Sequence, residues 1–204
     1  MVKRKKKDHK TANFTRRQGV REVKQSFLII CEGKNTEPDY FKAFRMTAAT
    51  VKALGEAMNT MSLVNKAINI REAEKSKKRF YNQCWVDDYP AHDFNQAIQL
   101  AEKNGFQVAY SNQAFEYWFL LHFNLYTGAI HRNQYNEILE KLTGMHYNKA
   151  EGYGALMYNL LLARQEKAIR NAETVLVEIS HGNPAEEESS TTVHKLVIEL
   201  NKYL

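Results

Sequence analysis

The sequence has little of what covalent cross-linking, membrane insertion or secretion requires. It contains only two cysteines, Cys31 and Cys84, in 204 residues. Both fall in apolar runs, so we expect core thiols of a reduced, cytoplasmic protein rather than a disulfide or a metal-binding pair. No apolar run approaches the roughly 18 residues of a membrane span. The basic beginning is not followed by the apolar stretch of a secretory signal. We therefore expect no membrane attachment.

Motifs for nucleotide and zinc binding are also missing. The nine glycines form neither a GxGxxG loop nor a GxxxxGK[S/T] loop, and His and Cys do not cluster at the spacing of metal ligands. The hydrophobic share of 44% and the charged share of 25% are typical of a globular protein. At this length, we expect one domain with a substantial core.

Positive charge is concentrated at the beginning of the chain. Residues 1–24 carry ten Lys and Arg against two acids, a net charge of +8, so the other 180 residues carry −2 of the total of +6. This segment lacks apolar periodicity, which predicts a disordered arm. Such an arm suits nucleic-acid phosphates, and a solvated tail that aids solubility is the alternative. The arm residues expected to contact phosphates are Lys3, Arg4, Lys5, Lys6, Lys7, Arg16 and Arg17. A second group of Lys and Arg, within 71–79, favours either a solvated helix face or a patch that faces phosphate.

Hydrophobic patterning predicts an α/β fold. The unbroken apolar run 27–31 is typical of a strand that is buried on both faces. Strands alternate with helices through the first two thirds of the chain, and consecutive parallel strands are joined by right-handed crossovers. We therefore expect a mostly parallel, four-stranded sheet flanked by helices. The strands are predicted over 26–32, 50–54, 83–87 and 106–111, and the helices over 38–46, 61–80, 94–104 and 115–123.

Further helices are predicted in the C-terminal part, over 133–142, 155–178 and 191–204. The second of these ends in TVLVEI, which could instead form a strand. We expect residues 25–130 to form the α/β core and residues 131–204 to add a helical part to the same domain.

Acidic residues follow two of the predicted strands. Glu32 follows the first strand, and Asp87 and Asp88 end the third. The carboxyl ends of parallel strands meet at one edge of a sheet, and clustered carboxylates repel one another unless they hold a cation. The sequence therefore predicts a site for Mg²⁺ or Mn²⁺ on these three residues, with Gly33 permitting a sharp turn beside it. A helix-capping role is the alternative for Glu32.

Other polar residues lie close to the same strand ends. Glu37 is either a further metal ligand or a first-turn acid that interacts with the helix dipole. Ser111 and Asn112 end the fourth strand and are candidates to line the site. Glu116, in a very aromatic helix, is either functional or part of a buried pair. His122 is expected in the core, with a ligand role as the alternative.

Several stretches resemble one known family. FLIICEGKNTEPDYF is similar to the opening motif of the RloB-like family, CEGxxTEpxYF. The similarity continues through NTMSLVNKAI, PAHDFNQAI, VAYSNQAFEYWFLLHF and SSTTVHKLVIEL, and it spans about residues 26–200. That family is similar to Toprim domains, a group that includes topoisomerases, primases and OLD-type nucleases. In Toprim domains, a Glu after the first strand and an Asp-x-Asp after the third bind Mg²⁺.

The resemblance implies roles for particular residues. Glu32 matches the catalytic Toprim Glu, Glu37 matches the family's second acid, and Asp87 and Asp88 fall where the Asp-x-Asp should lie. Glu116 and His122 match the family's FExWxxxHF. The chain departs from the family at WVDDYP, where the family has a sequence like FDxDxFP, so a true Asp-x-Asp is missing.

The resemblance also implies a function. RloB-like proteins are encoded with an ATPase of the ABC/AAA type in restriction and abortive-infection loci. We therefore expect a Mg²⁺-dependent nuclease that acts on DNA or RNA phosphodiesters as the effector of a two-component antiphage system, with the ATPase as partner. The alternative is a non-catalytic Toprim-like scaffold that docks on the ATPase and senses nucleic acid or a phage protein. The missing Asp-x-Asp favours this alternative.

Overall fold

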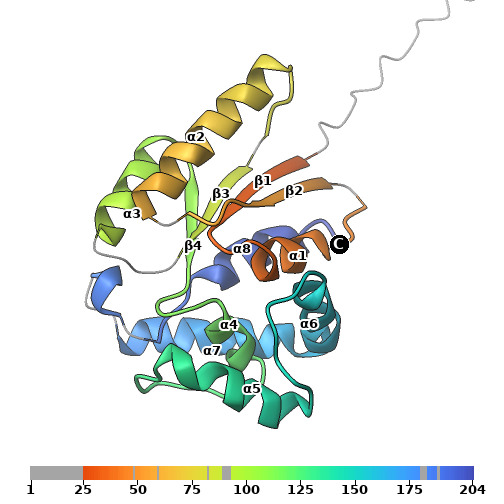
Figure 1. The fold of residues 1–204 in the computed structure, drawn as a ribbon, viewed down its shortest axis with the longest axis vertical. Coiled ribbons are helices and arrows are strands. Elements are labelled where there is room, and N and C mark those ends of the chain that lie inside the picture. The colour runs from red at the N-terminus through yellow and green to blue at the C-terminus, as the bar shows by residue number, and fades with distance from the viewer. Residues whose placement is uncertain are drawn as a thin grey trace, which may run out of the picture.

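Strands and helices alternate through the first half of the described chain (Figure 1). The structure, a computed structural model, describes residues 25–47, 49–58, 60–81, 83–88, 93–179, 183–187 and 189–204, and it describes only the backbone of Asp87 and Asp88. The basic segment 1–24 therefore lies outside the described residues.

The sheet has four strands, all parallel, in the order β2-β1-β3-β4. The strands are β1 (Gln25–Cys31), β2 (Ala49–Gly55), β3 (Gln83–Asp88) and β4 (Gln107–Tyr110). The predicted fold class is confirmed, and β1 lies between two neighbouring strands, as its apolar run indicated.

Each face of the sheet is covered by helices. Phe27, Ile29 and Cys31 of β1 belong to one hydrophobic cluster, and Leu28 and Ile30 belong to another, because successive side chains of a strand point to opposite faces. The second cluster lies under α2 (Thr60–Ser76) and α3 (Phe94–Lys103), and the first lies under α1 (Thr36–Lys42) and the later helices (Figure 1).

The later helices share the larger hydrophobic cluster with α1 and with the sheet. They are α4 (Glu116–Leu121), α5 (Tyr135–Thr143), α6 (Tyr153–Leu161), α7 (Gln165–Glu178) and α8 (Val193–Asn201), with 3₁₀ turns at Arg132–Gln134, Leu162–Arg164 and Pro184–Glu186. Within the described part of the chain, none of the helices has the length and apolar character needed to cross a membrane.

Two sequence-based predictions in this part were wrong. The single helix expected over 155–178 is two helices, α6 and α7, separated by the 3₁₀ turn. The final helix begins at Val193 rather than at residue 191, because Thr191 pairs with Ser111 in an antiparallel bridge. The TVLVEI segment is helical, with Val175 buried and Val177 79% exposed, so only one side of it meets the core.

A glycine sets the closest approach between α1 and the helical part. A β-carbon at Gly154, in α6, would lie 2.0 Å from the backbone oxygen of Thr36 and 2.8 Å from the backbone nitrogen of Tyr40. The first turn of α1 therefore lies directly against α6. This contact fixes the position of the residues that follow β1.

Candidate functional site

A cavity of about 640 Å³ lies at the edge of the sheet where β1 ends. Its lining comes from four parts of the chain: the turn between β1 and α1, the segment between β4 and α4, the start of α5 and the loop before α6. Its charged residues are three carboxylates and three cations: Glu32, Glu37 and Glu116 with Lys34, Arg132 and Lys149. This balance suits a ligand that carries both a cation and phosphate groups.

The backbone of the turn after β1 is held by the end of β2. The amide of Glu56 donates to the carbonyl of Cys31 (3.1 Å), and the amide of Ala57 donates to the carbonyl of Glu32 (3.0 Å). A β-carbon at Gly55 would lie only 2.3 Å from the carbonyl oxygen of Gly33. Half-buried Glu32 is therefore placed at the end of the central strand by a well-supported backbone.

Gly33 makes room for the carboxylate of Glu37. A β-carbon at residue 33 would lie 1.8 Å from Oε2 of Glu37, so the carboxylate occupies the space that any other residue would fill. Burial raises the pKa of Glu37 to about 7; its own backbone N–H and Lys149 act against this, and Glu116 and Glu32 add to it. Glu37 is thus able to exchange a proton near neutral pH.

Glu116 is buried at the first turn of α4 and has two partners on the loop before α6. Its Oε1 atom accepts a hydrogen bond from the Tyr147 hydroxyl (2.7 Å) and pairs with Lys149 Nζ (2.7 Å). Burial and the Glu116 carboxylate both raise the pKa of Tyr147. Burial lowers the pKa of Lys149, but Glu116, Glu37 and Glu32 outweigh it and leave that pKa above its usual range. Lys149 therefore carries a positive charge among three carboxylates.

The loop before α6 is attached to the start of α1. The side-chain amide of Asn35 donates to the carbonyl of Lys149 (3.1 Å), and the amide of Gly152 donates to the Asp39 carboxylate (2.6 Å). The Lys149 side chain is 61% exposed, whereas that of Glu116 is 3% exposed. The pair therefore reaches from the core to the mouth of the cavity.

Asp87 and Asp88 belong to the neighbouring strand at the same edge of the sheet. Asp87 pairs in register with Cys31 and Ala109, and Asp88 pairs with Tyr110. Their side chains lie outside the description, so their approach to Glu32 stays a prediction. Among the side chains that are described, no group of three or more His, Cys, Asp or Glu is placed to hold a metal ion.

Ser111 and Asn112 turn toward the C-terminal segment. The Ser111 hydroxyl hydrogen-bonds to that of Thr191 (2.8 Å), and the Asn112 side-chain amide donates to the carbonyl of Pro184 (3.0 Å). Both residues are buried. In the structure they connect β4 to the segment before α8, and the part of the β4–α4 segment that lines the cavity begins at the next residue, Gln113.

His122 lies in the core, away from the cavity. Its Nδ1 atom is 2.9 Å from the carbonyl of Trp118, and its ring packs edge-on against the Trp118 indole. Burial lowers its pKa to about 4, with Arg164 acting in the same direction. A neutral, fully buried imidazole at this position contributes to packing.

The chain can also be compared with known proteins. The family described as RloB-like protein matches residues 27–200, which include all six charged residues of the cavity. The chain belongs to the RloB-like family. The family match begins after the basic segment 1–24. Searches among curated proteins and among solved structures found no match.

Sequence reasoning missed the three cations of the cavity of this RloB-like protein, Lys34, Arg132 and Lys149. It also missed Tyr147, which hydrogen-bonds to Glu116. Tyr147 and Lys149 lie in an irregular loop more than 30 residues from Glu116, where no strand end or periodic pattern marks them. The partial signal was Glu116 itself, since a carboxylate in a fully buried helix requires a hydrogen-bond donor or a cation.

The elevated pKa of Glu37 predicts how the stability of the metal-free protein depends on pH. Because the folded-state pKa is above the unfolded value of 4.5, ionisation of Glu37 destabilises the fold as pH rises from about 4.5 to about 7. Glu37→Gln should match wild type near pH 4.5 and be more stable by up to about 3 kcal/mol at pH 8. Chemical denaturation in EDTA at both pH values measures this difference. Exposed Glu173→Gln is the control, and a gain at pH 8 no larger than the control's would contradict the prediction.

Proposed function

We propose that this RloB-like protein is a Mg²⁺-dependent nuclease that cleaves nucleic-acid phosphodiesters as the effector of a two-component antiphage system. The observation that carries the proposal is the position of Glu32, at the end of the central strand and on the wall of a cavity that also contains cations. An acid at the carboxyl end of a central parallel strand faces the crevice where α/β proteins bind ligands.

The residues of the cavity fit Mg²⁺ together with a phosphate. Mg²⁺ is usually held by one or two carboxylates plus waters and substrate phosphates, so a cluster of three protein ligands is not required. Glu32 would hold the ion, with Asp87 and Asp88 as further ligands. The Glu37 and Glu116 carboxylates already have positions set by Gly33 and by Lys149. Mn²⁺ has the same ligand preference.

Each group would have a distinct task in hydrolysis. Lys149 and Arg132 would bind non-bridging phosphate oxygens and orient the phosphodiester. Glu37 would accept a proton from the attacking water; its pKa is about 7 without metal, and a cation bound at Glu32 would lower that pKa and keep the carboxylate ionised. When bound, Mg²⁺ lowers the pKa of a water molecule and stabilises the leaving oxygen.

A cleavage assay tests the proposal. The purified chain is incubated with labelled single- and double-stranded DNA and RNA in Mg²⁺, in Mn²⁺ and in EDTA, with and without an ATPase encoded by a neighbouring gene. Cleavage that requires a divalent cation supports the nuclease. No cleavage under any of these conditions would contradict it.

One observation favours a second function. Lys149 lies among the three carboxylates and pairs with the most buried of them, an arrangement that reduces the repulsion among the carboxylates without any metal. A non-catalytic Toprim-like scaffold, docked on an ABC/AAA ATPase and sensing nucleic acid or a phage protein, would need no more than this. Co-purification with the ATPase without metal-dependent cleavage would select this function.

We further propose that the protein acts in the cytoplasm. Cys31 and Cys84 belong to separate hydrophobic clusters on opposite faces of the sheet, and both are buried core thiols. Their arrangement supports a protein of a reducing compartment.

We expect the basic arm to contribute to nucleic-acid binding. Deleting residues 1–22 should weaken binding and reduce its dependence on salt, because each phosphate contact contributes about 0.7–0.9 to the slope of log K against log salt. The melting temperature should change little, since the segment has few apolar side chains. Binding titrations at several salt concentrations measure the effect. An unchanged affinity and slope would assign the arm to solubility.

A further inference from the structure

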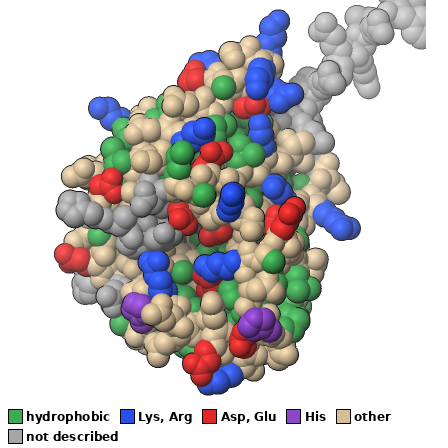
Figure 2. Space-filling view, in the orientation of Figure 1, with side chains coloured by type: hydrophobic (Ala, Val, Ile, Leu, Met, Phe, Trp, Pro, Cys, Tyr) green, Lys and Arg blue, Asp and Glu red, His purple; other side chains and the backbone are tan. Residues whose placement is uncertain are grey.

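A second charged region lies at the end of α2 and in the segment that leads into β3. We call it the α2–β3 corner and define it by Arg71, Lys75, Lys77, Lys78, Arg79 and Phe80. Lys and Arg side chains gather at this end of the molecule, over the C-terminal end of α2 (Figures 1 and 2). The corner is next to the beginning of β1, because the Ser26 hydroxyl donates to the carbonyl of Phe80 (3.1 Å). It therefore lies at the edge of the sheet opposite to the cavity.

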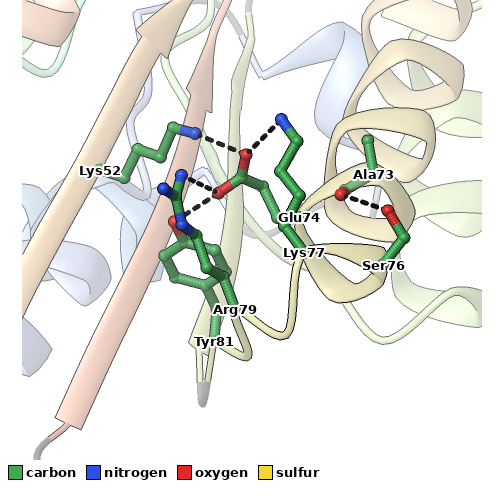
Figure 3. A network of polar contacts seen from close by, with 7 residues as sticks. All are labelled: Lys52, Ala73, Glu74, Ser76, Lys77, Arg79 and Tyr81. Carbon is green, nitrogen blue, oxygen red and sulfur yellow. Dashed lines mark hydrogen bonds and ion pairs between the residues drawn. The ribbon is translucent and has the colours of Figure 1, made fainter.

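One buried carboxylate organises the cations of the corner. Glu74 is 4% exposed and lies between Lys52 of β2 (3.1 Å), Lys77 (3.6 Å) and Arg79 (3.3 Å), and it accepts a hydrogen bond from Tyr81 (3.3 Å) (Figure 3). The hydrogen bond from Lys52 outweighs burial and, together with Arg79, lowers the pKa of Glu74 to about 2. Glu74 stays ionised and holds these cations in place.

The corner keeps a surplus of positive charge at its surface. Among the described residues, only Glu72 and Glu74 pair with its cations and with Lys52. The side chains of Lys75, Lys77 and Arg79 are 60–64% exposed. Lys78 makes no ion pair with the described residues. Exposed cations with few acidic partners create a positive surface potential that attracts anions such as phosphates.

The backbone of the corner is also unusual. α2 ends with the amide of Lys78 donating to the carbonyl of Lys75 and the amide of Arg79 donating to the carbonyl of Glu74. This is the Schellman pattern, in which the left-handed residue is normally Gly. Here it is Lys78, with a φ of 60°. A long cationic side chain thus occupies a position at which Gly or Asn would be less strained.

An aromatic ring is exposed among these cations. Phe80 is 68% exposed, and it lines a hollow of about 260 Å³ with Tyr81, Arg71, Glu72, Lys75 and Arg79. An exposed ring next to cations that can contact a backbone is the combination by which proteins bind single-stranded nucleic acid: the ring stacks on a base and the cations contact phosphates. A duplex would leave the stacking surface of Phe80 unused, because its bases are already stacked on one another. A protein partner that uses Phe80 as an apolar anchor is the other outcome of the tests below.

We propose that the α2–β3 corner binds single-stranded nucleic acid, with phosphates on Lys75, Lys77, Lys78 and Arg79 and a base stacked on Phe80. The site is separate from the cavity, since the seven residues of β1 rise about 3.3 Å each and place the two about 20 Å apart. It does not rest on the proposed nuclease activity, because binding here requires neither a metal nor cleavage.

The charge component is tested by fluorescence anisotropy with a labelled 20-nucleotide oligo(dT), on the full chain in EDTA at several KCl concentrations. Lys75→Gln with Lys78→Gln should weaken binding severalfold and reduce the salt slope by about 1.4, or 0.7 for each phosphate contact. The control is Lys141→Gln with Arg170→Gln. It removes two exposed cations from α5 and α7, where each pairs with a surface Glu, and it should change neither value. Equal effects of the two double variants would overturn the proposal.

The stacking component is tested with Phe80→Ala and Phe80→Trp. Loss of one stacked base should weaken oligo(dT) binding about tenfold in Phe80→Ala, and Phe80→Trp should restore it. Binding of a 20-base-pair duplex should respond to the lysine variants but not to Phe80→Ala. Because Phe80 is exposed, melting temperatures should stay close to that of wild type. Oligo(dT) binding that is unchanged in Phe80→Ala would overturn the proposal, as would corner variants that lose only the association with an ATPase.

Discussion

Glu32→Gln should abolish metal-dependent cleavage of nucleic acid and leave the metal-free protein folded. The substitution keeps the size of the side chain but removes the charge that would bind Mg²⁺ at the end of the central strand. In the proposed nuclease, no other described carboxylate replaces it, because Glu37 lies over Gly33 and Glu116 is paired with Lys149. Initial cleavage rates of wild type and variant, with the same oligonucleotide and Mg²⁺ concentration, measure the effect.

The stability of the metal-free Glu32→Gln variant shows whether Glu32 is a metal ligand or only a capping residue. The Glu32 carboxylate raises the pKa of Glu37 and that of Lys149, so it repels the first and attracts the second. These effects oppose each other, and we expect Glu32→Gln to keep or slightly increase the stability of the metal-free protein. A carboxylate that only caps the turn would instead cost about 1 kcal/mol when removed. Exposed Glu102→Gln of α3 is the control for a change of charge alone.

Gly154→Ala should cause the largest loss of stability. The new β-carbon would lie 2.0 Å from the Thr36 carbonyl oxygen, and that atom belongs to the backbone of α1, which a side-chain rotation cannot move. We expect a loss of at least about 2 kcal/mol, which lowers the melting temperature of a domain of this size by roughly 4–8 °C or more. Because α1 carries Glu37, the shift of the helix should also disturb the cavity.

Gly128→Ala is the matched control for this substitution. A β-carbon at Gly128 has no neighbour within 4 Å, and its φ is outside the left-handed region. The change should be neutral or slightly stabilising, because Ala restricts the unfolded chain. The melting temperatures of both variants compare the same Gly→Ala change at a position without space for a β-carbon and at one with space. Equal melting temperatures would contradict the close packing of α1 on α6.

The sheet and the position of Glu32 could be predicted because their signals are local. An unbroken apolar run identifies a strand that meets a hydrophobic cluster on each face, and β1 contributes to both clusters. The polar residue that ends such a run must then lie at the edge of the sheet. The helices after residue 132 were recognised as helices for the same reason, from their apolar spacing.

The features that could not be predicted depend on long-range contacts. The break between α6 and α7 falls at Leu162–Arg164, residues that all favour helix, so only tertiary packing turns the chain there. Ser111 and Asn112 directly follow β4, close to the expected strand end, but their partners lie more than 70 residues later. The pairing of Lys149 with Glu116 joins a loop to a helix across 33 positions of the chain. No local pattern records such contacts.

The melting temperature of wild type and Glu32→Gln, with and without millimolar Mg²⁺, tests the proposed metal site most directly. A ligand that binds only the folded state stabilises it by RT ln(1 + [L]/Kd). The wild-type melting temperature should therefore rise with the Mg²⁺ concentration, and that of Glu32→Gln should not. If both proteins respond identically to the ion, Glu32 holds no metal, and the nuclease proposal is contradicted.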